Sequence, residues 1–88
     1  MMTAEDRIAE IRTRLESAFD PYELAIQDDS HLHVGHAGAR SGKGHFTVRI
    51  RAAAFDGQAP LARHRAIYAA LGQLMDSEIH ALTIDAAP

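Results

Sequence analysis

Hydrophobic and polar positions alternate in two rhythms along this chain of 88 residues. A period of 3.6 residues, typical of a helix with one apolar face, runs over 3–19 and over about 59–75. A period of two, typical of a half-buried strand, marks three segments: 22–28, 45–52 and 79–85. A short helical turn is expected at 53–55. The predicted order is therefore α-β-β-α-α-β.

The ends of the two helices also follow from the sequence. Thr3 is a suitable N-cap for the first helix, and Pro21 bars its continuation. Pro60 fits the first turn of the second helix. The second helix is expected to bury its large apolar side chains: Leu61, Ile67, Tyr68, Leu71 and Met75.

The connections between the strands predict their pairing. The first two strands are joined by a loop over 29–44, and we expect them to pair antiparallel. The chain then passes through helices, and a right-handed crossover sets the second and third strands parallel. The predicted fold class is α+β, with one domain over 1–88 and a three-stranded mixed sheet covered by helices on one face.

Composition narrows the class of protein. Apolar residues make up 47%, charged residues 24%, and the formal net charge is -3, which is typical of a globular chain and not of a disordered one. No apolar stretch approaches the roughly 20 residues of a membrane helix, and the first residues do not resemble a secretory signal. We therefore expect a cytoplasmic protein that neither spans nor binds a membrane. The chain has no cysteine, which excludes thiolate nucleophiles, dithiol redox cycles and all-cysteine iron–sulfur sites.

Charge is distributed unevenly along the chain. Residues 1–39 carry a formal charge of -5, residues 40–65 carry +5, and residues 66–88 carry -3. A basic band of this kind attracts acidic partners, whether protein or nucleic acid.

Histidine is concentrated in one segment. Four of the six histidines lie within fifteen positions: His31, His33, His36 and His45. Such a glycine-rich segment is ordinarily a solvated loop. The functional alternative is that its histidines supply imidazole ligands to a metal. A separate zinc site at His31-x-His33-x-x-His36 is a further alternative, against which stand the absence of helical spacing and of a paired carboxylate.

Several short motifs together resemble the BolA family: Asp29-Ser30-His31, His45-Phe46, Phe55-x-Gly57, Arg63-His64-Arg65 and Ile79-His80-Ala81-Leu82. The resemblance covers about 8–86. It implies a class II KH-like fold and two roles. One is partnership with a monothiol glutaredoxin around a shared 2Fe–2S cluster, in iron–sulfur trafficking or iron regulation. The other is DNA-binding transcriptional regulation. Small departures occur at Ala53, Ala54, Ala62 and Ala66.

The resemblance also implies the iron ligands. One is His80, and a second comes from the loop, where His33 is the closer match and His36 its neighbour. Glutaredoxin and glutathione supply thiolates, so no cluster is expected in the isolated protein, a monomer or weak homodimer. From the residues alone, strand parity groups His80 with Leu82 and Ile84 as a half-buried core histidine. His45 is expected to be structural or on the surface.

The DNA-binding alternative uses Arg63, His64 and Arg65 at the start of the long helix, in a helix–turn–helix-like arrangement. The turn "FDGQAP" lacks the Gly-x-x-Gly motif with which KH modules grip a nucleic-acid backbone. The chain also lacks a Gly-x-Ser-x-Gly elbow and a phosphate-binding loop, so the sequence predicts a non-enzyme.

Overall fold

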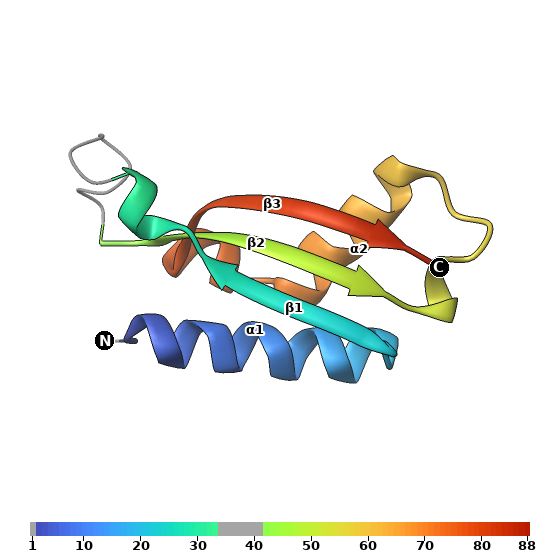
Figure 1. Cartoon of the computed structure of the whole chain (residues 1–88), viewed down its shortest axis with the longest axis horizontal. Helices are drawn as coiled ribbons and strands as arrows, with labels where there is room; N and C mark the ends of the chain where they lie inside the picture. The colour runs from blue at the N-terminus through green and yellow to red at the C-terminus, as the bar shows by residue number, and fades with distance from the viewer. Residues whose placement is uncertain (1, 34–41) are drawn as a thin grey trace.

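The computed structural model of this protein describes residues 2–33 and 42–88. Figure 1 shows the elements in chain order. They are α1 (Ala4–Phe19), β1 (Glu23–Asp28), the 3-10 helix η1 (Ser30–His33), β2 (Gly44–Arg51), the 3-10 helix η3 (Ala53–Phe55), α2 (Pro60–Leu71), α3 (Leu74–Ser77) and β3 (Ile79–Ala87). Within the described residues, no helix is long and apolar enough to cross a membrane.

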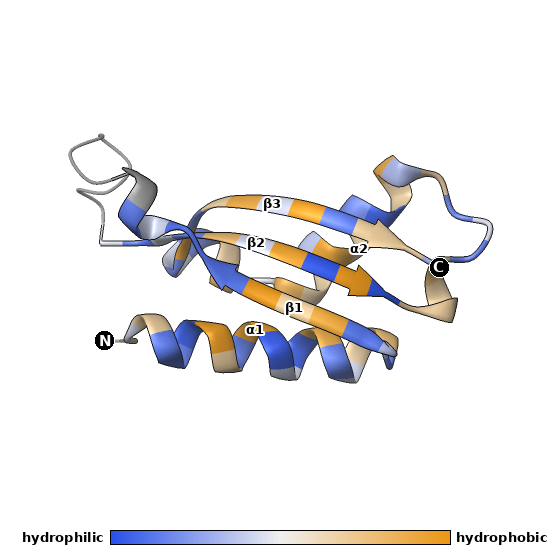
Figure 2. Ribbon diagram, in the orientation of Figure 1, coloured by the Kyte–Doolittle hydropathy of each residue, from blue (hydrophilic) through white to orange (hydrophobic). Residues whose placement is uncertain are grey.

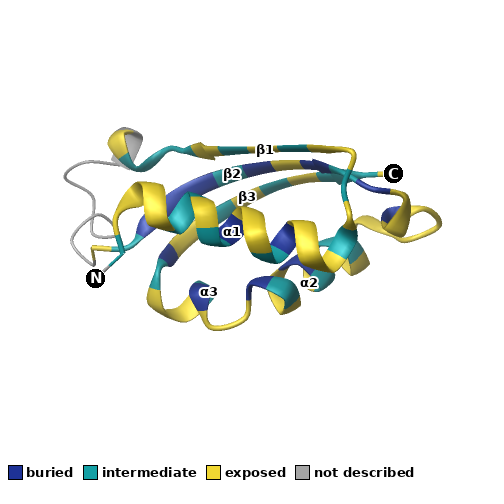
Figure 3. Ribbon diagram, turned by 90° about the horizontal axis from the view of Figure 1, so that it is seen from below, coloured by how far each residue is buried: buried dark blue, intermediate teal, exposed yellow. Residues whose placement is uncertain are grey.

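The three strands form one sheet with β2 at its centre. β1 pairs with β2 antiparallel, and β2 pairs with β3 parallel. The helices lie together on one face of this sheet (Figure 3). The mixed α+β architecture and the strand pairing predicted from the sequence are confirmed, and the arrangement is compatible with a class II KH-like fold.

The first helix begins and ends as its sequence predicts. Thr3 and Asp6 form a capping box, in which the Asp6 N–H donates to Thr3 Oγ1 over 3.1 Å and the Thr3 N–H donates to Asp6 Oδ2 over 2.9 Å. The hydrogen bond from the Thr3 backbone is the main reason that the pKa of Asp6 is lowered. Asp20, with φ of 47°, then turns the chain into Pro21.

The core lies between β2 and the helices. One face of β2 is fully buried, and Figure 2 shows hydrophobic positions alternating with polar ones along the strands. Its partners come from α1, η3, α2 and α3, and Figure 3 shows buried positions on the helices that cover the sheet. The buried side chains that make this core include Ile11, Leu15, Phe46, Val48, Ile50, Phe55, Ile67 and Leu71. Such burial is the main stabilising contribution in a domain without disulfides.

In the second half of the chain, the structure corrects two predictions from the sequence: where the long helix ends and which of its apolar side chains are buried. The helix expected over about 59–75 ends at Leu71, because Gly72 adopts a positive φ of 55° that breaks the helix before α3. The stripe of α2 that faces inward is spaced by four residues, through Ile67 and Leu71. Leu61 and Tyr68 share a different stripe, and they are 60% and 41% exposed where burial was expected.

Candidate functional site

The start of β3 departs from a regular ladder. Gly44 pairs with Ile79, but the next residue of β2, His45, pairs with Ala81. His80 is therefore an extra residue without a partner on β2, as in a β-bulge. The parity that groups His80 with Leu82 is broken by this extra residue, and His80 is exposed whereas Leu82 is half-buried. The interpretation of His80 as a half-buried core histidine is therefore wrong.

His45 lies directly beside His80. The centroids of the two imidazole rings are 5.0 Å apart, and the ring planes are inclined by 45°. His45 is only 7% exposed. Of the two sequence-based alternatives for His45, the structural one is confirmed. Its closeness to His80 was missed, although the predicted parallel pairing places both residues at the starts of adjacent strands.

The backbone of His45 is held by the turn that follows β1. The His45 N–H donates to Ser30 Oγ over 3.1 Å, and the His45 carbonyl accepts from the Asp29 N–H over 2.7 Å. The Ser30 N–H donates in turn to Asp28 Oδ1 over 2.8 Å. Ser30 thus organises this turn through a hydrogen bond between its side chain and the backbone of β2. η1 is thereby fixed beside the start of β2.

The histidine-rich segment therefore starts at the end of the sheet where His80 lies. Figure 1 shows η1 and the starts of β2 and β3 at the same end of the molecule. His31 is exposed on η1, and His33 is the last residue of η1. The side chain of His33 and the whole of His36 lie outside the described residues, as do the zinc and iron hypotheses that depend on them.

A shallow pocket opens at the same end, between the start of α1, η1 and the start of β2. Its lining includes Arg7, His31, Lys43 and His45. In the described ranges 2–33 and 42–88, no group of three or more histidine or acidic side chains is arranged to hold a metal ion.

Gly44, the first residue of β2, lies against the ring of Phe46, where only a residue without a Cβ atom fits. A Cβ atom on Gly44 would overlap the ring of Phe46, so the backbone approaches the core more closely than any other residue type permits. The Gly44 N–H donates to the carbonyl of Glu78 over 2.9 Å. This bond joins the beginnings of β2 and β3 immediately before the bulge.

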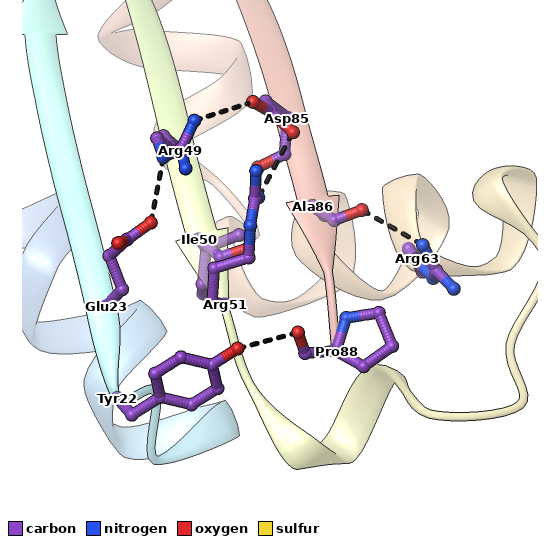
Figure 4. A network of polar contacts seen from close by, with 9 residues as sticks. All are labelled: Tyr22, Glu23, Arg49, Ile50, Arg51, Arg63, Asp85, Ala86 and Pro88. Atoms are coloured by element: carbon purple, nitrogen blue, oxygen red, sulfur yellow. Dashed lines mark hydrogen bonds and ion pairs between the residues drawn. The ribbon is translucent and has the colours of Figure 1, made fainter.

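The three basic residues proposed for DNA differ in their exposure and contacts. Arg63 is half-buried, and its Nη1 donates to the carbonyl of Ala86 on β3 over 3.1 Å (Figure 4). His64 is half-buried, and Arg65 is exposed. Arg63 is thus engaged in holding α2 to the sheet, and of the three residues only Arg65 is exposed.

The basic side chains of β2 are also engaged with acids. Arg49 pairs with Glu23 over 2.8 Å and with Asp85 over 3.6 Å, and Arg51 pairs with Asp85 over 3.1 Å (Figure 4). The hydrogen bond from Arg51 lowers the pKa of Asp85, and the hydrogen bond to Glu23 raises the pKa of Arg49. Part of the basic band is therefore neutralised within the fold, at the end of the sheet opposite to His80.

Comparison with known proteins points to one family. The family model described as BolA-like protein matches residues 15–88. The SufE-like protein 1, chloroplastic/mitochondrial, of Arabidopsis thaliana is 43% identical over 79 residues, which cover 84% of this chain and 21% of that protein. BolA-like protein 1 of Homo sapiens is 40% identical over 78 residues, covering 89% of this chain and 55% of that protein.

Solved structures agree with the family match. The BolA domain of SufE1 from Arabidopsis thaliana superposes with a TM-score of 0.81 at 37% identity, covering 100% of this chain and 96% of that chain. BolA1 from Mus musculus gives 0.78 at 35% identity, covering 100% of this chain and 70% of that chain. Protein BOLA1, chloroplastic, of Arabidopsis thaliana has 52% of its length covered. The chain thus spans about a fifth to a little over half of these curated relatives.

Proposed function

Because this chain belongs to the BolA-like protein family, we propose that it is an accessory protein that pairs with a monothiol glutaredoxin. The two proteins share a 2Fe–2S cluster, either in iron–sulfur trafficking or in regulation by iron. The observation that carries this proposal is the exposed imidazole of His80, set out from β3 by the register shift and packed beside buried His45.

The donor set of the chain fits half of such a site. Iron–sulfur clusters are normally held by thiolates, and neutral imidazole replaces thiolate in some of them. This chain has six histidines and no cysteine, so it supplies imidazole only. The remaining ligands in the proposal are thiolates from glutaredoxin and its bound glutathione.

The geometry favours His80 as the first ligand. Its backbone belongs to a strand that is paired on both sides of the extra residue, at Ile79 and Ala81. A ligand on a fixed backbone loses little conformational freedom when it binds. The second ligand in the proposal is His33 or His36, in the segment that begins at η1, beside the start of β2.

We propose a binding role without catalysis, and DNA-binding regulation remains the alternative. The observed engagement of Arg63 with Ala86 takes one of the three proposed DNA contacts into the fold. A residual role would therefore rest on Arg65 and His64. The cytoplasmic location stays a prediction, since two relatives are named as chloroplastic or mitochondrial proteins.

The test is reconstitution of the complex. The purified chain is mixed with a monothiol glutaredoxin, glutathione, iron and sulfide, and visible absorption and elution from a sizing column are recorded. We expect a heterocomplex whose cluster spectrum differs from that of the glutaredoxin homodimer. A homodimer spectrum with no co-elution would reject the proposal. Salt-sensitive binding to a DNA duplex under the same conditions would favour the alternative.

A further inference from the structure

One arginine of α1 reaches two segments that lie far from it in the sequence. Arg7 Nη2 donates to the carbonyl of Gly42 over 2.6 Å, and Arg7 Nε donates to Glu78 Oε1 over 3.0 Å. The side chains of Arg7 and Glu78 are only 13% and 18% exposed. This pair is therefore better shielded from solvent than the Arg14–Glu10 pair of α1 or the pairs of Arg49 and Arg51 on the sheet, and its hydrogen bonds contribute correspondingly more.

The two segments that Arg7 joins are the entries to β2 and β3. Gly42 lies two residues before β2, and Glu78 immediately precedes β3, two residues before His80. The carbonyl of Glu78 also accepts from the Gly44 N–H over 2.9 Å. One guanidinium thus connects α1, the entry to β2 and the entry to the strand that carries His80. Arg7 and His45 also line the same pocket.

We call the contacts that join Arg7, Gly42 and Glu78 the Arg7 junction. Arginine is suited to this junction because its planar guanidinium donates in two fixed directions at once. A lysine at position 7 keeps the positive charge but presents one rotatable ammonium. It cannot hold both acceptors in the same fixed arrangement. The contacts of position 7 therefore depend on the fixed geometry of the guanidinium more than on its positive charge.

We propose that Arg7 is a positioning residue for His80. By holding Glu78 and Gly42 together, it sets the register at which β3 starts and keeps the His80 ring beside His45. The role of this arrangement in holding iron rests on the proposed function. The arrangement itself does not, and it has its own readout.

The same helix offers a matched control. Arg14 also bonds an acid and a backbone carbonyl: its Nε donates to Glu10 Oε1 over 2.9 Å and its Nη1 to the carbonyl of Leu71 over 2.8 Å. The first contact lies within α1, and the second ties α1 to the end of α2, on a different part of the fold from His80. Arg7→Lys and Arg14→Lys therefore make the same chemical change, and only the first disturbs the junction.

The experiment measures three quantities on the full chain: the ring-proton NMR shifts of His80, the exchange rate of the Gly44 amide, and unfolding in urea. In Arg7→Lys we expect the His80 ring shifts to move toward those of an imidazole with no neighbouring ring. We expect Gly44 exchange to rise about tenfold, the effect of losing one charge-assisted bond locally. Arg14→Lys should leave both readouts unchanged, although it also disturbs two hydrogen bonds of α1. Glu78→Gln keeps a hydrogen-bond acceptor at position 78 but removes the negative charge. It therefore weakens the same junction from the side of Glu78 and serves as a second test.

The outcomes separate this proposal from the proposed function. Equal effects of Arg7→Lys and Arg14→Lys on His80 and Gly44 would overturn the positioning role, because the change would then be global. In the complex with glutaredoxin and glutathione, Arg7→Lys should speed cluster loss several-fold while Arg14→Lys does not. A cluster that survives equally in both variants, although the His80 ring is displaced in Arg7→Lys, would support the positioning role and reject His80 as a cluster ligand. If the wild-type chain forms no heterocomplex cluster, the proposed function fails, and the ring shifts still decide whether Arg7 places His80.

Discussion

The imidazole of His80 lies against the imidazole of His45, with ring centroids 5.0 Å apart. The first ring is exposed and the second is buried. A buried ring with a fixed backbone restricts the positions that its exposed neighbour adopts. The structure thus presents one imidazole to solvent in a restricted position, which is the condition under which a ligand binds a partner's metal with little loss of entropy.

The first prediction ranks the histidine ligands. His80→Ala should speed cluster loss from the heterocomplex by roughly tenfold or more, since even the loss of a hydrogen-bond partner of a metal ligand commonly costs about 10–100-fold in metal affinity. His33→Ala should act more weakly, because a loop ligand must be ordered on binding. The double change His33→Ala with His36→Ala should act more strongly than either alone. The measurement is the decay of visible absorption.

Two other histidines serve as controls for that ranking. His31 and His64 are placed on η1 and α2, and neither is assigned to iron. Their replacement by alanine should leave the decay unchanged. Wild-type decay in His80→Ala, together with rapid loss in His31→Ala or His64→Ala, would show that the ligand assignment is wrong.

The second prediction concerns the close approach at Gly44. A methyl group there would overlap the Phe46 ring, so Gly44→Ala should lower the free energy of unfolding by about 1–3 kcal/mol, the usual cost of overpacking. Urea unfolding measures this. Phe46→Leu should cost less in the Gly44→Ala background than in the wild type, because the smaller side chain relieves the overlap. Strict additivity of the two changes would contradict this explanation.

The third prediction separates two neighbouring arginines of α2. Arg63→Ala removes a half-buried hydrogen bond from a charged donor to the Ala86 carbonyl, and it should cost about 1.5–3 kcal/mol in the free energy of unfolding. Arg65 is exposed, so Arg65→Ala should change stability by less than about 0.5 kcal/mol. Urea unfolding again gives the comparison. Equal costs would mean that the Arg63–Ala86 bond does not hold α2 to the sheet.

The fourth prediction is a pH dependence at Asp85. The hydrogen bond from Arg51 lowers the pKa of Asp85 below its ordinary value of 3.8. A carboxyl group whose pKa is lowered by folding adds stability above the unfolded-state pKa, and this contribution disappears as the pH falls through the folded-state value. The stability difference between the wild type and Asp85→Asn should therefore be constant above about pH 5 and shrink below about pH 4. A difference that grows on acidification would contradict the assignment.

Much of the fold was predictable because its signals are local. The capping pair at Thr3, the stop at Pro21 and the alternation of Phe46, Val48 and Ile50 each specify an element from neighbouring residues. The antiparallel pairing then followed from the loop that joins the first two strands, and the parallel pairing from the helical crossover between the second and the third. The break at Gly72 was less visible, because an isolated glycine in an apolar helical pattern is often tolerated.

The site was predicted only in part, because its geometry depends on pairing between distant segments. The histidine of the last strand was identified from a family motif, but its exposure depends on a register shift that no local pattern encodes. The neighbourhood of His45 and the junction at Arg7 likewise join residues far apart in the sequence. The hydrogen bond from Arg63 to the carbonyl of Ala86 likewise depends on how α2 packs against β3.

The most direct test of the central claim asks whether a nitrogen of this chain binds the cluster. The chain is labelled with 15N only in its histidines, the heterocomplex with unlabelled glutaredoxin and glutathione is reduced, and pulsed electron paramagnetic resonance records nitrogen couplings. Our account predicts a 15N coupling in the wild type, of which the component from His80 disappears in His80→Ala. A reduced cluster that shows no 15N coupling to this chain would contradict the account.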